Sequence, residues 1–309
     1  MPSARLEPDA TAFYAAQSDF SDPNDLAPLY ADLPKDPAQL ARTARDLMIH
    51  RLEGELFGHV IPQDRLHNDA ETRYLDDILR IIVDRGAGPL TRRRAVRDRF
   101  VGVCRDFALL HCSFLRHAGV SSRLRSGFAD YFGPDGFHVD HVVTEYWDSE
   151  RGWLLADAEL ADPMVTGTWK VDFDPMDVPR DRFLVAGKAW QAIRAGEADP
   201  KTFGLHPPQE GPMYGEFFVA GSIRLDLAAL NKVETLLWDI WDIWGTEPDS
   251  DEKMTDTVRE LYDQAALVAS DDVPFDAARK LFTQNDGLRT PRTVLSLAPF
   301  NGPSEVTLR

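Results

Sequence analysis

A change of hydrophobic period near residue 119 constrains the fold of this chain more than any other feature. Residues 104–118 place apolar side chains on one helical stripe, and Gly119 stands where such a helix would end. The following segments alternate between apolar and polar residues, which is typical of half-buried strands. These predicted strands cover 120–128, 138–147 and 152–158. We therefore predict an α+β core in which a helix packs on an antiparallel sheet.

Helical patterns flank this core on both sides. Helices are predicted over 38–57, 69–85, 186–195, 222–230, 233–244, 254–270 and 275–283. In 233–244 the residues Trp238, Trp241 and Trp244 recur at helical spacing, which indicates packing rather than a cofactor site. Residues 285–309 are predicted to be irregular. The chain then divides into an N-terminal helical region (1–68), a catalytic core (69–165) and a mainly helical C-terminal region (166–309) packed on the core.

The charge balance excludes some classes of partner. There are 51 acidic and 34 basic side chains, for a formal net charge of -17. Such a chain repels nucleic acid and anionic membranes, and we expect neither as a partner. The Arg-rich stretch 91–100 lacks interleaved aromatic residues and is interpreted as a solvated helix face. The first 30 residues contain no apolar leader, and no apolar run is long enough to span a membrane, so a cytoplasmic location is predicted.

The two cysteines differ in their sequence context. Cys104 opens the predicted helix 104–118, where the helix dipole and unpaired N–H groups favour the nucleophilic thiolate. Gly102 would leave room for a substrate beside it. A small buried hydrophobic residue is the alternative interpretation of Cys104. Cys112 falls in mid-helix on the apolar flank and is predicted to be structural. Two thiols are too few for a disulfide framework or a four-cysteine zinc site.

A histidine and an aspartate on neighbouring predicted strands could serve such a thiol. If Ser149 is the middle of a three-residue loop that pairs 147 with 151, His141 lies opposite Asp157. Directly opposed side chains share a face of the sheet, so the carboxylate could accept the imidazole Nδ1–H and fix its tautomer. Nε2 would then exchange a proton with Cys104. A slip of one residue would break this pairing.

Two stretches, GVCRDFALLHCSFLRHAGVSSRLRSGFADYF and DHVVTEYWDSERGWLLADAEL, resemble the transglutaminase-like superfamily. That superfamily includes transglutaminases, peptide N-glycanases and many unassigned bacterial proteins. The resemblance covers roughly residues 70–165. It implies a papain-like fold with Cys104 as nucleophile, His141 as general acid and base, and Asp157 as its orienting acid. The matching residues are Gly102, Cys104, Arg116 through Gly119, Arg123, Gly127, His141, Glu145, Gly152, Trp153 and Asp157.

The sequence departs from the superfamily pattern at two places. Relatives commonly carry a Trp within three residues of the histidine, where this chain has Val142 and Val143. The aspartate is often followed by Pro or Thr, and here Ala158 follows it. Neither change removes the proposed chemistry, but the missing Trp can alter the acyl pocket.

Other polar residues near the predicted triad have two interpretations each. Arg105 and Asp106 follow the nucleophile and either contact substrate or form a salt bridge on the helix surface. Arg123 and Arg125 share a strand face and either neutralise acidic neighbours or bind a substrate carboxylate. A metal site at His138, Asp140 and His141 is disfavoured, because residues 138 and 141 face opposite sides of a strand.

Three functions compete on this basis. The chain is an amide hydrolase or peptidase, an acyltransferase that passes an acyl group to an amine, or a catalytically silent scaffold for binding. The complete set of Cys104, His141 and Asp157 argues against the scaffold. The expected partners are an amide- or acyl-bearing substrate and, for transfer, an amine acceptor. No cofactor or metal is required.

Overall fold

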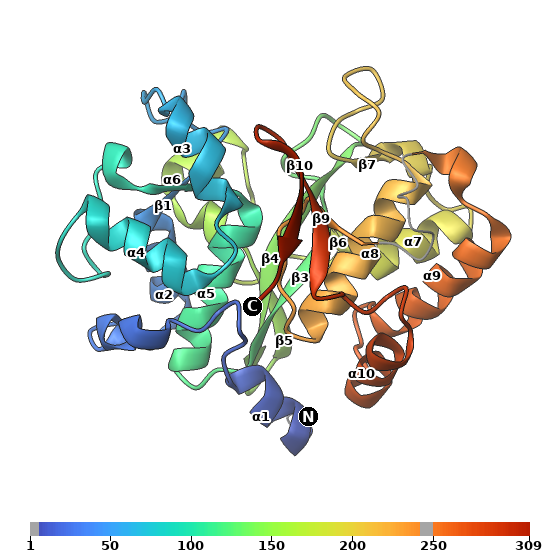
Figure 1. Ribbon diagram of the computed structural model, residues 1–309, viewed down its shortest axis with the longest axis horizontal. Helices are drawn as coiled ribbons and strands as arrows, with labels where there is room; N and C mark the ends of the chain where they lie inside the picture. Colours follow the sequence, from blue (N-terminus) through green and yellow to red (C-terminus); the bar gives the residue numbers. More distant parts are fainter. Residues whose placement is uncertain (1–5, 242–249) are drawn as a thin grey trace. The chain divides into compact units, whose positions relative to one another are not determined.

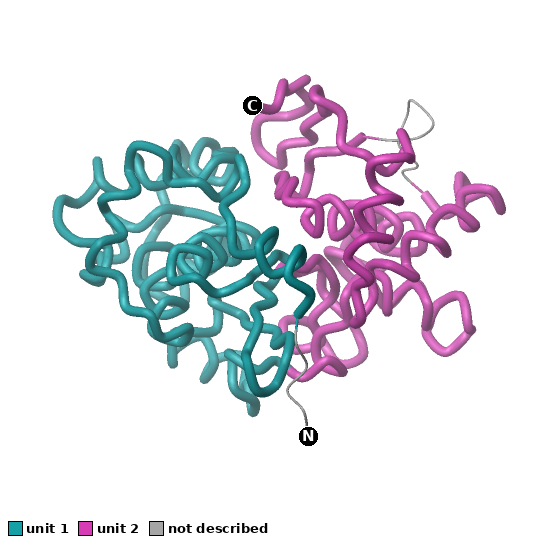
Figure 2. The backbone as a smooth tube through the Cα atoms, turned by 90° about the horizontal axis from the view of Figure 1, so that it is seen from below, with its two compact units in different colours: residues 1–124, 143–178 teal, residues 125–142, 179–309 magenta. Residues whose placement is uncertain are grey.

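The protein, seen here as a computed structural model, is described over residues 6–241 and 250–309. The chain forms two compact units (Figure 2). Unit 1 comprises Met1–Leu124 and Val143–Val178, and unit 2 comprises Arg125–Val142 and Pro179–Arg309. Helix and strand are mixed, which confirms the α+β class. The division into three consecutive regions stays a prediction.

Unit 1 is built around the helix that carries Cys104. This helix, α5, spans Cys104–His117, and every residue from Cys104 to Arg116 is buried. It contacts α1, α2 and the 3-10 turn η4, and Thr144 Oγ1 donates to the Ala108 carbonyl at 3.1 Å. The predicted helix 104–118 is confirmed. The other helices of unit 1 are α1 (Pro8–Ala15), α2 (Pro37–Leu47), α3 (Gln63–Asn68), α4 (Leu75–Arg85) and α6 (Pro163–Thr168), with η4 at Ala158–Ala161 (Figure 1).

The helix predicted over 38–57 ends ten residues earlier than expected. The Asp36 side chain accepts from Gln39 N at its start, but α2 stops at Leu47. The chain then continues as β1 (Met48–His50), which pairs in parallel with β2 (Phe100–Gly102). The prediction was wrong because this pairing, with residues 52 positions away in the sequence, takes the main-chain groups that a longer helix would use. The prediction for 69–85 is confirmed from Leu75 onward, after a short 3-10 turn at Asp69–Glu71.

The three predicted strands are confirmed as β3 (Ser122–Ala129), β4 (His138–Asp148) and β5 (Gly152–Ala156). They belong to a sheet whose described strands run in the order β5-β4-β3-β6, with β7 beside β4 (Figure 1). The strands β6 (Phe183–Val185) and β7 (Phe203–Gly204) are short.

The turn between β4 and β5 is placed differently from the prediction. Trp147 pairs with Trp153 and Asp148 with Gly152, so position 147 does not face 151. Asp148 Oδ1 accepts from the backbone N–H groups of Glu150 and Arg151, both at 2.9 Å, and Gly152 has a φ of +86°. This turn fixes a register two residues away from the expected one, so the prediction that His141 lies directly opposite Asp157 was wrong. Because side chains alternate with a period of two, every residue keeps its predicted face.

Unit 2 contains the remaining helices and a second sheet. Its helices are α7 (Ala186–Arg194), α8 (Glu216–Leu230), α9 (Asp256–Val268) and α10 (Phe275–Gln284), and each confirms a predicted helix. The strands β8 (Asp239–Ile240), β9 (Thr293–Ala298) and β10 (Gly302–Thr307) form a sheet in the order β10-β9-β8. The prediction of an irregular chain end was therefore wrong.

The helix predicted over 233–244 is also wrong within the described residues. Residues 233–236 form neither helix nor strand, and Leu297 N donates to the Trp238 carbonyl at 2.8 Å as β8 joins the sheet. Asp239 Oδ2 accepts from Leu236 N at 3.1 Å and shapes the turn before the strand. The helical spacing of Trp238 and Trp241 was thus not a helix signal, and Trp244 lies outside the described residues.

The basic stretch 91–100 is not the solvated helix face that was predicted. It contains only a 3-10 turn at Val96–Asp98, and Arg94 and Arg99 are buried. The Arg94 guanidinium donates to the carbonyls of Pro89, Arg92 and Gly88. Burial lowers the pKa of Arg99 to about 10. These arginines hold loops in place from within the fold.

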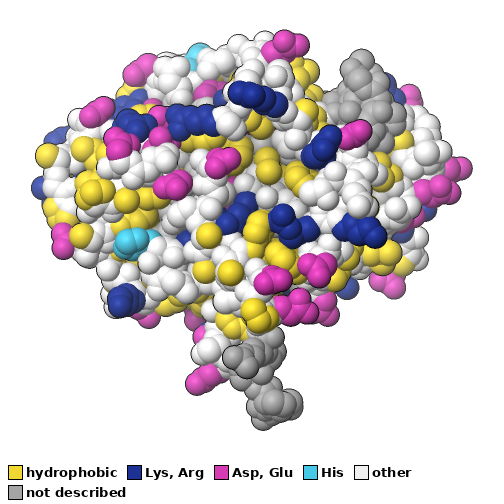
Figure 3. All heavy atoms as spheres, turned by 60° about the horizontal axis from the view of Figure 1, so that its bottom comes forward, with side chains coloured by type: hydrophobic (Ala, Val, Ile, Leu, Met, Phe, Trp, Pro, Cys, Tyr) yellow, Lys and Arg dark blue, Asp and Glu magenta, His cyan; other side chains and the backbone are white. Residues whose placement is uncertain are grey.

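On the surface, charges of both signs lie together. Figure 3 shows Lys and Arg side chains interspersed with Asp and Glu on one face, in spite of the net charge of -17. Among the helices of residues 6–241 and 250–309, none combines the length and the apolar character needed to cross a bilayer.

A buried ion pair within unit 2 connects β3 to the helices α8 and α9. Arg125 Nε and Nη2 donate to Asp226 Oδ1 and Oδ2 at 3.1 and 3.0 Å, and neither residue is exposed. Asp226 Oδ1 also accepts from Ser126 N at 2.8 Å. Arg125 donates further to the carbonyls of Ala269 and Ser270. One carboxylate on α8 therefore fixes both β3 and the end of α9.

We expect Asp226→Ala to destabilise the protein by about 3–5 kcal/mol, because it leaves the Arg125 charge buried without its carboxylate. Urea unfolding measures the change. Replacing both partners, as Arg125→Met with Asp226→Leu, should recover much of the loss. Asp286→Ala is the control, since its pair with Arg289 is largely exposed and should matter by less than about 0.5 kcal/mol. A loss below about 1 kcal/mol for Asp226→Ala would contradict this role.

Candidate active site

Cys104 is the first residue of α5. Val103 precedes it as the N-cap residue, and the Asp106 carboxylate reaches back so that its Oδ2 accepts from Val103 N at 2.9 Å. This bond fixes the first turn in which Cys104 stands. The thiol is 6% exposed. Its position at the positive end of a 14-residue helix favours the thiolate form.

The structure requires glycine at position 102 for a different reason from the one predicted. A Cβ atom at this position would lie 2.9 Å from Asp106 Oδ2 and 3.0 Å from Met48 Cε. The space beside Gly102 is therefore filled by the capping carboxylate and by β1. Glycine is needed here so that the Asp106 cap can form, and the cap in turn fixes the turn that holds Cys104.

Arg105 and Asp106 form a salt bridge, but not on the helix surface as predicted. Arg105 Nη1 lies 2.9 Å from Asp106 Oδ1, and both side chains are buried. Arg105 Nη2 also donates to the Arg73 carbonyl at 2.6 Å. Burial raises the pKa of Asp106, while the Arg105 charge and the Val103 N–H oppose that rise. A contact of these two residues with substrate stays a prediction.

Sequence analysis missed Arg51. Its backbone N–H donates to the Gly102 carbonyl at 2.9 Å, directly after the β1–β2 pairing of His50 with Gly102. Burial lowers the pKa of Arg51, and the charges of Cys104, Asp106 and Glu71 oppose this. A guanidinium thus acts electrostatically on the candidate nucleophile. No local spacing links residue 51 to residue 104, so only the parallel strand pairing could have identified it.

Asp157 lies just after β5 in a buried polar cluster of unit 1. The residue is 2% exposed, and its Oδ1 accepts from Glu159 N at 3.0 Å, while its own N–H donates to the Pro175 carbonyl. Its negative charge acts on His111, whose pKa burial lowers to about 4. Burial raises the pKa of Glu159, and the charges of Glu53 and Asp157 raise it further. Asp157 therefore sits where an additional positive charge would be favourable.

His141 lies on the part of β4 that belongs to unit 2 and is 3% exposed. Aromatic rings meet its imidazole nearly at right angles. The ring centroids of Phe132, Tyr131 and Phe183 lie 4.9, 6.0 and 6.2 Å away. These rings, which sequence analysis did not single out, limit rotation of the imidazole and keep water away from it.

The residues named for the metal alternative do not form a metal site. The His138 ring stacks on Phe203 with centroids 4.6 Å apart. In the part of the chain that the structure describes, no three His, Cys, Asp or Glu side chains are grouped to hold a metal ion.

Arg123 and Arg125 both pair with carboxylates of the chain. Arg123 Nε donates to Glu145 Oε2 at 2.7 Å, and its guanidinium lies over the Trp153 ring at 3.9 Å. Arg125 pairs with Asp226 as described above. Neutralisation of acidic neighbours is therefore what these arginines do in the fold, and binding of a substrate carboxylate stays a prediction.

Cys112 differs from Cys104 as its sequence position suggested. It is fully buried in mid-helix, and its Sγ lies 3.3 Å from Ser122 Oγ. This thiol takes part in packing α5 against β3.

Comparisons with known proteins agree with the resemblance. Residues 83–158 match the model of the transglutaminase-like superfamily. Among solved structures, a candidate cysteine protease from Cytophaga hutchinsonii matches with a TM-score of 0.34 and 17% identity. That match covers 53% of this chain and spans 47% of the other. No curated protein matches the sequence. The superfamily match supports cysteine-based catalysis in general.

We expect Arg51→Met to slow alkylation of Cys104 by iodoacetamide about 3- to 10-fold near pH 7, because a neighbouring cation favours the thiolate. The two rates should converge at high pH, where the thiol ionises without help. Peptide mapping by mass spectrometry follows Cys104 and Cys112 separately. Arg97→Met is the matched control, since Arg97 is 80% exposed. Equal rates near pH 7, or a loss that persists at high pH, would contradict the electrostatic role.

Proposed function

We propose that the protein is a cysteine-dependent amide hydrolase or acyltransferase in which Cys104, His141 and Asp157 form the catalytic triad. The observation that carries the proposal is the position of Cys104 at the first turn of α5, inside the segment that matches the transglutaminase-like superfamily. The cap by Asp106 and the charge of Arg51 both support a reactive thiolate there.

In the proposed first step, the Cys104 thiolate attacks the carbonyl carbon of a carboxamide. Backbone N–H groups near Cys104 would stabilise the oxyanion. The C–N bond then breaks, imidazolium His141 donates its proton to the leaving amine, and a thioester remains on the sulfur. In the second step, water or an acceptor amine attacks the thioester and gives a proton to His141. The thiolate departs, so the enzyme returns to its starting state with a free acid or a new amide as product.

The strand alternation supports the pairing of His141 with Asp157. Glu145 pairs with Leu155 in the β4–β5 hairpin, and His141 and Asp157 each differ from these two residues by an even number of positions. Residues with that parity share a sheet face. The buried negative charge of Asp157 would orient and stabilise an imidazolium.

Two observations favour an enzyme over a catalytically silent scaffold. The cap and the nearby cation would favour a reactive thiolate at Cys104, which simple packing does not require. Cys112 on the same helix has neither feature, although it packs well. Hydrolysis or acyl transfer follows from whether water or an amine reaches the thioester. Both reactions therefore belong to the proposal.

The proposal is tested by intact-mass spectrometry after incubation with a library of amides and activated esters, with and without an added primary amine. A mass increase equal to the acyl group should appear and map to Cys104. Decay to free acid identifies a hydrolase, and conversion to a new amide identifies an acyltransferase. Cys104→Ala should abolish the adduct, and Cys112→Ala should keep it. An adduct that survives Cys104→Ala would refute the assignment.

We expect Asp157→Asn to lower turnover by about 10²–10³-fold, less than the roughly 10⁴-fold known for a serine triad, because a thiolate–imidazolium pair needs less help from the acid. The Asn side chain can still accept from Glu159 N, so the fold should persist. Asp162→Asn is the matched control, since Asp162 is also a buried helix-capping aspartate. The pH profile of turnover distinguishes an orienting acid from a structural residue. Only the loss of an orienting acid should shift the acidic and basic limbs of that profile. Unchanged activity would make Asp157 a structural residue.

A further inference from the structure

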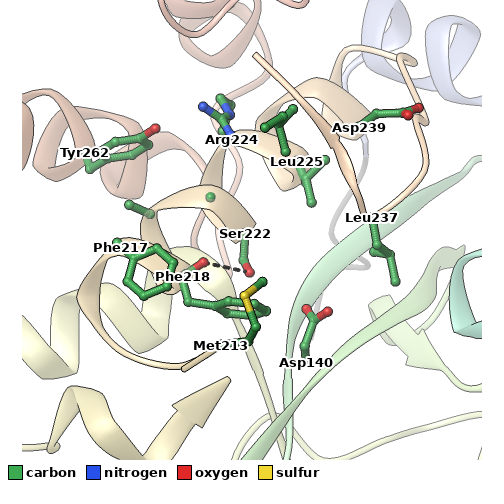
Figure 4. A pocket seen from close by; sticks show the side chains of 13 residues that line it. Asp140, Met213, Phe217, Phe218, Ser222, Arg224, Leu225, Leu237, Asp239 and Tyr262 are labelled. Carbon is green, nitrogen blue, oxygen red and sulfur yellow. Dashed lines mark hydrogen bonds between the residues drawn. The ribbon is translucent and has the colours of Figure 1, made fainter. Parts of the chain in front are cut away.

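A cavity lies within unit 2. None of the residues of the proposed triad lines it. Its volume is about 90 Å³, small beside the roughly 300 Å³ or more of pockets for drug-sized ligands. Its lining comes from α8, from the loops before and after that helix, from β8, from α9 and from one residue of β4. Figure 4 shows the Asp140 carboxylate pointing into the cavity, with Met213, Phe218 and Leu237 around it.

Asp140, which is partly buried, differs from three fully buried carboxylates of the chain. Asp106, Glu145 and Asp226 are each paired with an arginine. Within residues 6–241 and 250–309, the Asp140 carboxylate has no hydrogen-bond or ion-pair partner, unlike these three. Burial raises its pKa to about 7, and only the charge of His141 opposes this rise. A carboxylate in a mainly apolar cavity is costly unless a cation or a hydrogen-bond donor compensates it.

The other walls of the cavity suit the alkyl part of a small organic cation. Phe217 and Phe218 contribute aromatic rings, and Leu225, Leu237 and Met213 contribute aliphatic and thioether surface. Aromatic faces attract ammonium groups, and methionine adapts to short alkyl chains. Arg224 lies over the Trp241 ring at 5.1 Å, and Asp239 accepts from Leu236 N.

We propose that this cavity is a binding site for a small primary alkylammonium ligand, with Asp140 as its anionic partner and the Phe217 and Phe218 rings along its alkyl chain. Asp140 and His141 are consecutive in β4, so their side chains point to opposite faces of the sheet. The ligand is therefore distinct from an acceptor amine at the triad. The proposed binding site does not depend on the proposed catalytic function, and each can be tested without the other.

The test is isothermal titration of the full chain with n-butylammonium chloride at pH 8, with butan-1-ol as the uncharged probe of similar shape. The ammonium should bind saturably with a Kd in the millimolar range or below, and butan-1-ol at least 10-fold more weakly, because a charge-assisted hydrogen bond is lost. This comparison needs no variant. Equal binding of the two probes, or no saturable binding of the ammonium, would overturn the proposal.

Asp140→Asn should weaken ammonium binding at least 10-fold while the melting temperature stays the same or rises, because an uncompensated carboxylate has been removed. Asp135→Asn, an exposed aspartate in the preceding loop, should bind as the wild type does. An Asp140→Asn protein that folds and binds with unchanged affinity would refute the role of the carboxylate.

Binding should also depend on pH. The cation needs the ionised carboxylate, so affinity should rise between pH 6 and 8 and level off above the pKa of Asp140, which is about 7. The other ionisable groups near Asp140 are His141 on β4, Arg224 on α8, Asp239 on β8 and Tyr262 on α9. Asp140→Asn should abolish the rise. A slope that persists in this variant would assign the titration to another of these groups and contradict the site.

Discussion

The burial of α5 from Cys104 to Arg116 is the constraint on which unit 1 depends. A helix that is buried on all sides must find a partner for every polar side chain that it carries, because an unpaired polar group in the interior costs about 1–3 kcal/mol. Ser113 Oγ donates to the Ser21 carbonyl at 2.8 Å and lies 2.9 Å from the Tyr30 hydroxyl. Arg116 donates to Ser21 Oγ at 2.7 Å and to the Ser122 carbonyl. The N-terminal segment and the start of β3 are therefore held against the helix by its own polar residues.

The same rule explains why so many arginines lie inside a chain with an excess of acidic residues. Arg45 pairs with Glu53 at 2.8 Å, Arg123 with Glu145, and Arg125 with Asp226. Such pairs add little net stability compared with apolar residues of similar size. Removing one partner, however, strongly destabilises the fold. They make strand and helix positions mutually dependent. The net charge of -17 thus describes the whole composition and not the interior, where basic groups are matched to acidic ones.

The sequence predicted elements whose causes are local. The stripe of α5, the end of that helix near Gly119 and the alternation in β3, β4 and β5 all follow from neighbouring residues. The prediction failed where distant residues decided the outcome. Met48–His50 left the predicted helix to pair with β2, and the residues around Trp238 joined β9 as a strand.

Part of the candidate site could be predicted in the same way. Cys104 was identifiable, because the start of a helix is a local property. The turn after Asp148 required knowledge of its two N–H bonds and of the positive φ at Gly152, so the register was predicted two residues away. Arg51 could not be found at all, since only the parallel β1–β2 pairing brings it to Gly102. The aromatic rings around His141 come from two separate segments, residues 131–132 and Phe183, and share no sequence pattern.

The order β10-β9-β8 has a consequence for self-association. β10 stands at the end of this sheet in the described part of the chain, and an edge strand can recruit a strand from another molecule. On the neighbouring strand, Leu295 and Leu297 are 39% and 41% exposed, and an added strand could bury part of their apolar surface. Pro303 lacks the N–H that a new ladder needs, and Glu305 places a carboxylate on the same strand. The composition of β10 therefore protects the protein against edge-to-edge aggregation at high concentration.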